Sequence, residues 1–156
     1  MIRNRLTKWQ DLTDGNVIFL SSLRFRTLGQ QLQRLSDFEC VATSGVGTSV
    51  RNLRPHPGEQ SMYQVSLPND TGFDYALVRV WPGTLAGRYI MAVGGSHTWG
   101  TEGAVVYITD AASLRELRTK LANPVQGSTG LQILLRVQVK DAQVVSASYV
   151  THHWMR

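Results

Sequence analysis

The strict alternation of apolar and polar residues near the C-terminus is the feature that most narrows the folds available to this chain. The apolar members of the pattern are Leu131, Ile133, Leu135, Val137 and Val139. A period of two is typical of a strand with one buried face. Residues 140–143 then predict a tight turn into a partner strand over 144–151. The pattern therefore predicts a terminal antiparallel hairpin, and with it a β-sheet.

Short apolar runs and helical spacings precede this hairpin. Runs typical of strands cover 16–20, 38–43, 48–53, 61–67, 75–81 and 88–93, and helical patterns cover 25–35, 102–108 and the residues after Asp110. The runs at 16–20 and 88–93 are continuously apolar, which is typical of strands buried on both faces. Asp110 is a good N-cap, and Asn123-Pro124 ends the helix that follows it. Two strand-loop-helix units predict an α/β fold: a Rossmann-like three-layer domain with parallel central strands in a mixed sheet, and the antiparallel hairpin at its C-terminus.

The length and composition indicate one cytoplasmic domain. A chain of 156 residues fits a single domain over 1–156, with residues 1–15 as a lead-in or the end of a linker from a larger protein. No apolar run reaches the roughly 20 residues that a membrane helix needs, and the N-terminus has no signal-peptide pattern. The single cysteine, Cys40, excludes an intrachain disulfide and a cysteine-based zinc site.

The charge balance favours an anionic partner. Sixteen basic residues against eleven acidic ones leave a net charge of +5. Most of the basic residues are arginines, which suit phosphate and carboxylate groups. They are scattered and form no dense run, so a solvated basic surface and a patch assembled by folding are both open, and nucleic acid stays among the partners to consider.

Two loops that leave predicted strands carry the groups that could bind such a ligand. Ligands of open α/β sheets bind beyond the carboxyl ends of strands. The first loop offers hydroxyl and guanidinium groups, and the second offers glycine amides, side-chain donors and a ring for stacking. The candidate ligand-binding residues are Ser21, Ser22, Arg24, Gly94, Gly95, Ser96, His97, Trp99 and Thr101. Glycines permit close approach of a ligand to free amides at a helix start, so we expect these loops to form one pocket. A tight structural turn is the alternative interpretation of the glycines.

Catalysis and metal binding have less support from the sequence. Ser96 and His97 could act with a distant carboxylate such as Glu59 or Glu102, but sequence neighbours seldom point at each other as a nucleophile and its base must. His152 and His153 alternate across a strand and so cannot chelate one ion together. We therefore expect no metal, no cofactor and no catalytic residue. The segment 54–59 is interpreted as a rigid connector, with His56 or Glu59 lining a pocket as the alternative.

Several motifs in order resemble a known family. The chain reads NVIFLSSLR over 16–24, RPHPGE over 54–59 and GTEGA over 100–104. In this order it is similar to a bacterial α/β domain at the C-terminal end of regulatory proteins that carry winged-helix or other DNA-binding modules. The family's first loop reads Gly-Ser-Pro-Arg-x-Asn, so Ser22 and Arg24 match it, whereas Ser21, Leu23 and Arg26 depart from it. A fold-level similarity to SLOG-type sensors implies a Rossmann-like fold and a nucleotide-derived ligand.

These observations predict a non-catalytic sensor or regulatory domain that binds a small anionic ligand and acts on a fused or partner module. One alternative is a hydrolase or transferase acting on a nucleotide or sugar phosphate. The other is an interaction module that self-associates into a homo-oligomer through exposed strand edges.

Overall fold

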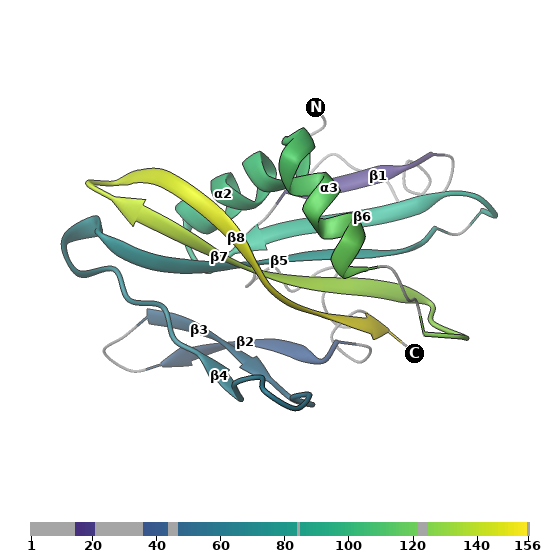
Figure 1. The fold of residues 1–156 in the computed structure, drawn as a ribbon, viewed down its shortest axis with the longest axis horizontal. Coiled ribbons are helices and arrows are strands. Elements are labelled where there is room, and N and C mark those ends of the chain that lie inside the picture. The colour runs from purple at the N-terminus through teal and green to yellow at the C-terminus, as the bar shows by residue number, and fades with distance from the viewer. Residues whose placement is uncertain (1–14, 21–35, 44–46, 84, 122–124, 156) are drawn as a thin grey trace.

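β-Strands predominate in the computed structural model, which describes residues 15–20, 36–43, 47–83, 85–121 and 125–155 (Figure 1). The strands are β1 (Val17–Leu20), β2 (Phe38–Thr43), β3 (Gly47–Asn52), β4 (Met62–Tyr63), β5 (Gly72–Pro82), β6 (Tyr89–Gly95), β7 (Gly130–Lys140) and β8 (Gln143–Met155). Two α-helices, α2 (Thr98–Thr109) and α3 (Ala111–Lys120), and a 3-10 helix, η3 (Pro68–Asp70), complete the described elements.

The strands form two sheets. The larger has five strands in the order β1-β6-β5-β7-β8, and the smaller has three in the order β2-β3-β4. Within the larger sheet only β1 and β6 are parallel, while β5 pairs antiparallel with both β6 and β7. The terminal hairpin is present, since β7 and β8 pair antiparallel, from Gly130 opposite Met155 to Lys140 opposite Gln143.

The helices cover one face of the larger sheet, and the smaller sheet covers the other (Figure 1). A separate hydrophobic core lies under each of them. Ala76 and Val78 of β5 pack with Ala104 and Tyr107 of α2 on the helix side. Tyr75, Leu77 and Leu134 pack with Phe38, Val50 and Tyr63 of the smaller sheet on the other side. Adjacent residues of one strand thus enter different cores, because successive side chains of a strand point to opposite faces.

The predicted Rossmann-like three-layer fold with parallel central strands is wrong. Such a fold alternates helices with parallel strands and covers both sheet faces with helices. In the described part of the chain α2 and α3 are consecutive between β6 and β7, and the second face is covered by the smaller sheet. Residues 74–78 of β5 are all buried, and a second sheet buries the second face of a strand as well as helices do.

Other local predictions had mixed outcomes. Asp110 caps α3 as predicted, since its carboxylate accepts a hydrogen bond from the Ser113 backbone N–H at 2.7 Å. The prediction that the strand at 16–20 is buried on both faces is wrong, because β1 lies at the sheet edge and Ile18 and Leu20 are more than half exposed. The helix predicted over 25–35 lies outside the described residues.

The described helices include none that is both long and apolar enough to span a membrane.

Candidate functional site

Polar side chains gather where the smaller sheet meets β8, and we call them the histidine–carboxylate cluster. Its members are Asp37, Asn52, His56, Glu59, Thr151 and His153. The first four belong to the segment that forms or flanks β2 and β3, and the last two belong to β8. The cluster therefore joins parts of the chain that are far apart in sequence.

His153 lies at the centre of the cluster. Its side chain is 1% exposed, with Nδ1 2.9 Å from a carboxylate oxygen of Asp37 and Nε2 2.9 Å from one of Glu59. Ionised carboxylates only accept hydrogen bonds, so both contacts can form together when both ring nitrogens carry protons. The ring thus bridges two acidic groups, and it also packs 4.7 Å from the Phe38 ring.

Glu59 is the most heavily hydrogen-bonded member. One oxygen accepts from Asn52 Nδ2 at 2.8 Å and from the His56 backbone N–H at 2.9 Å, while the other accepts from the Thr151 hydroxyl. Burial acts to raise the pKa of this carboxyl, but the hydrogen bonds outweigh it and lower the pKa from 4.5 to about 2. Glu59 is consequently an anion at neutral pH.

The loop between β3 and β4 places His56 and Glu59 by its own local chemistry. Prolines at 55 and 57 restrict the backbone, and Gly58 adopts the positive φ of 87° that favours glycine. The Glu59 backbone N–H donates to the His56 carbonyl at 3.0 Å, which closes the turn. The His56 ring consequently stacks on the His153 ring, with centroids 4.1 Å apart and 22° between the planes.

A β-bulge in β8 directs its two members into the cluster. Leu134 pairs with Thr151 and Leu135 pairs with Tyr149, so Val150 is an extra residue without a partner in the ladder. Thr151 and His153 then both face the smaller sheet. His152 faces the other way and contacts the Tyr149 hydroxyl through Nδ1 at 2.7 Å. The two histidines indeed point in opposite directions, but a different pair, His56 and His153, comes together.

In the turn at 94–101, the backbone N–H groups at the start of α2 bind a carboxylate of the protein itself. Fully buried Asp74 of β5 accepts from the backbone N–H groups of His97 at 3.0 Å and Gly100 at 2.7 Å. These are the free amides at the N-terminus of α2 that we expected to hold an anion. A Cβ on Gly100 would lie 2.5 Å from the Asp74 carboxylate, so this glycine allows the close approach.

The other predicted residues of this turn also have defined positions. Thr101 accepts from the Gly95 backbone N–H at 2.8 Å, and Trp99 Nε1 donates to the Ala142 carbonyl at 2.9 Å. Ser96 Oγ is buried and has no hydrogen-bond partner within the described structure, and His97 Nδ1 lies 3.4 Å from Asp74. The structure thus places His97 beside Asp74, whereas Trp99 and Thr101 bind other backbone groups, and Gly94 pairs with Leu77 across the sheet.

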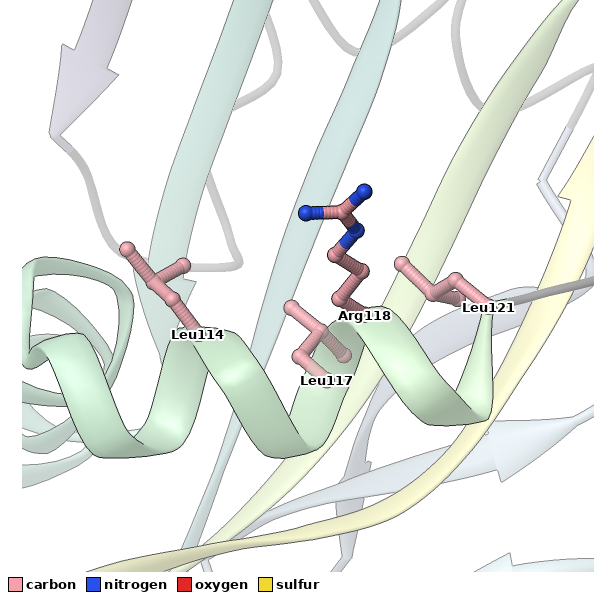
Figure 2. Close-up of a pocket in the computed structure, with 4 residues that line it drawn as sticks. All are labelled: Leu114, Leu117, Arg118 and Leu121. Atoms are coloured by element: carbon pink, nitrogen blue, oxygen red, sulfur yellow. The ribbon is translucent and has the colours of Figure 1, made fainter.

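The first predicted loop cannot be compared with the turn, because Ser21, Ser22 and Arg24 lie outside the described residues. Whether the two loops form one pocket stays a prediction. A hollow that the structure does contain lies along one face of α3 (Figure 2). It is lined by Leu114, Leu117, Arg118 and Leu121, so it offers mainly aliphatic surface and one cation.

Comparison with known proteins adds no identification: no protein-family model matches the chain, and neither a curated protein nor a solved structure is significantly similar to it. The family resemblance seen in the motifs stays a prediction.

Sequence reasoning missed most of the cluster. It noted His56 and Glu59 as alternatives for lining a pocket, but Asp37, Thr151 and His153 were not selected. A usable signal was present in β8, where polar Thr151 and His153 occupy alternate positions of a strand that buries one face. Buried polar side chains need partners, so this pattern predicts a polar site but not the residues that complete it.

Proposed function

We propose that this chain is a non-catalytic sensor domain whose ligand binds at the histidine–carboxylate cluster. The observation that carries the proposal is the bridge that buried His153 of β8 makes between Asp37 and Glu59. A ligand that competes for this ring or for Glu59 changes the contacts between the two sheets. Binding would therefore alter how firmly the smaller sheet is held, which is the response that a sensor needs.

The charges of the cluster bear on the class of ligand. Two carboxylates lie beside His153, and the α2 amides already have the Asp74 carboxylate as an acceptor. Arg54 pairs with Asp37 at 3.4 Å, but its side chain is 78% exposed, so solvent screens this contact. Like charges repel, so both places disfavour an anion and the cluster favours a cation. We accordingly revise the ligand class from anionic to cationic and keep the sensor role.

The enzyme alternative has one supporting observation. Asp74 lies within 3.4 Å of His97 Nδ1, so the turn contains an aspartate–histidine pair of the kind that orients a general base. Ser96 Oγ has no hydrogen bond to that imidazole among the described contacts. An activated nucleophile is therefore missing from this arrangement.

Hydrogen exchange of the 156-residue chain tests the sensor proposal. We expect ZnCl2, and not MgCl2, ADP or inorganic phosphate, to slow amide exchange in β2, β3 and β4, with ADP recovered intact. His153→Gln should abolish the protection, whereas His152→Gln, on the opposite face of β8, should retain it. Unchanged exchange with all four probes, or turnover of ADP, would overturn the proposal.

A further inference from the structure

We infer that His56, Glu59 and His153 form a binding site for one divalent transition-metal ion of the Zn²⁺ type. This inference deepens the proposed function and rests on it for the consequence of binding. One donor atom from each residue lies within 4.8 Å of the other two. The three donors come from a loop next to the smaller sheet and from β8, so a bound ion would join the two sheets through metal–ligand bonds.

The donor set selects the class of metal. Two imidazoles and one carboxylate are common ligands of Zn²⁺, which binds nitrogen and oxygen at about 2.0–2.2 Å and takes four ligands in a tetrahedron. Mg²⁺ and Ca²⁺ prefer sets made of oxygen alone. The His56 side chain is 61% exposed. Water can therefore reach the site and supply the fourth ligand.

Asp37 acts as a positioning residue for the central ligand. Its carboxylate lies 2.9 Å from Nδ1 of His153, and Nε2 is directed at Glu59. A carboxylate that accepts from the remote ring nitrogen of a metal-bound histidine fixes the orientation of the ring. With Nδ1 held by Asp37, Nε2 is the ring nitrogen that can offer its lone pair to the ion.

Binding requires a rotation of His56. The two imidazole rings are stacked, so their in-plane lone pairs do not converge on one point. His56 is exposed; its backbone N–H donates to one Glu59 oxygen, and its Nδ1 lies 3.6 Å from the other. Its side chain can therefore turn about its own bonds while the loop keeps its shape. The His153 and Glu59 donors, 2.9 Å apart, need only a small separation to admit the ion.

Metal titration of the 156-residue chain, stripped with EDTA and dialysed, tests the inference. We expect calorimetry with ZnCl2 to find one site per chain, and CoCl2 to give the visible absorption of tetrahedral cobalt. His56→Gln should weaken Zn²⁺ binding at least tenfold, and Asp37→Asn by roughly 10–100-fold. His152→Gln is the matched control and should bind as the wild type does.

The outcomes separate this inference from the proposed function. No binding of Zn²⁺ to the wild type, or equal weakening by His152→Gln and His56→Gln, would overturn the metal site and leave His153 as a purely structural ion bridge. His56 is exposed, so its variant tests the site even where a His153 variant fails to fold. If MgCl2 slows exchange in the smaller sheet while Zn²⁺ does not bind, the sensor role stands with another cation. Slowing by ADP or inorganic phosphate alone would overturn the cationic ligand class. If Zn²⁺ binds and exchange is unchanged, the metal site stands and the sensor proposal is wrong.

Discussion

At the scale of single residues, Asp74 illustrates how a buried charge is stabilised by backbone donors. Its oxygens accept from the backbone N–H groups of Tyr75, His97 and Gly100. Asp74→Asn would replace one acceptor oxygen with an amino group facing these donors. We expect a loss of roughly 2 kcal/mol in the free energy of unfolding, measured by urea denaturation. Asp141→Asn, at an exposed position, should change the free energy of unfolding little. Equal losses in the two variants would show that the backbone hydrogen bonds to Asp74 do not stabilise the fold.

Glu59 predicts a particular dependence of stability on pH. Its pKa is lowered to about 2 on folding, so the unfolded state binds the proton more tightly. The stabilisation is therefore complete above the unfolded pKa of 4.5 and is lost as the pH falls towards 2. We expect Glu59→Gln to lose roughly 2 kcal/mol at pH 7 after allowance for solvent screening.

Urea denaturation between pH 7 and pH 2 measures this contribution. The difference between wild type and Glu59→Gln should shrink below about pH 5 and nearly vanish near pH 2. Glu102→Gln, on the exposed surface of α2, serves as the control. A difference that stays constant over the whole range would show that the carboxylate charge contributes nothing.

At the scale of elements, the contact of α2 with the larger sheet depends on glycine. A Cβ at Gly100 would meet the Asp74 carboxylate at 2.5 Å and the Gly95 Cα at 2.9 Å. These neighbours are backbone or buried, so they cannot move aside easily. Gly100→Ala should therefore destabilise the protein by roughly 2–3 kcal/mol in thermal or urea unfolding, despite the better helix propensity of alanine.

Gly15→Ala is the matched control for this variant. Nothing lies within 4 Å of a Cβ built at Gly15, so we expect the unfolding free energy to change by less than about 0.5 kcal/mol. If the Gly100→Ala variant has the same unfolding free energy as the wild type, the tight docking of α2 on β5 is contradicted.

At the scale of the whole molecule, the two cores should respond separately. Ile133 and Leu134 are neighbours in β7 and are both buried, but Ile133 belongs to the helix-side core and Leu134 to the core under the smaller sheet. Each truncation to alanine should cost about 2–5 kcal/mol. In hydrogen exchange we expect Leu134→Ala to increase exchange first in β2–β4, and Ile133→Ala to increase it first in α2 and α3. The same pattern in both variants would indicate a single cooperative core.

Local chemistry allowed several elements to be predicted from the sequence alone. The β7–β8 hairpin follows from the period of two over 131–139, and the start of α3 follows from Asp110. The strands at 38–43 and within 75–81 follow from their apolar runs. In each case the signal lies within a few residues, because periodicity and capping depend on near neighbours.

Only the tertiary structure decided what covers the second face of the larger sheet and which polar groups meet there. An apolar run records that a strand is buried and does not record whether a helix or a sheet buries it. Glu59 and His153 are 94 residues apart, and Asp74 and Gly100 are 26 apart, so no local pattern joins them. Their pairing depends on strand order and on the bulge at Val150, which long-range packing sets.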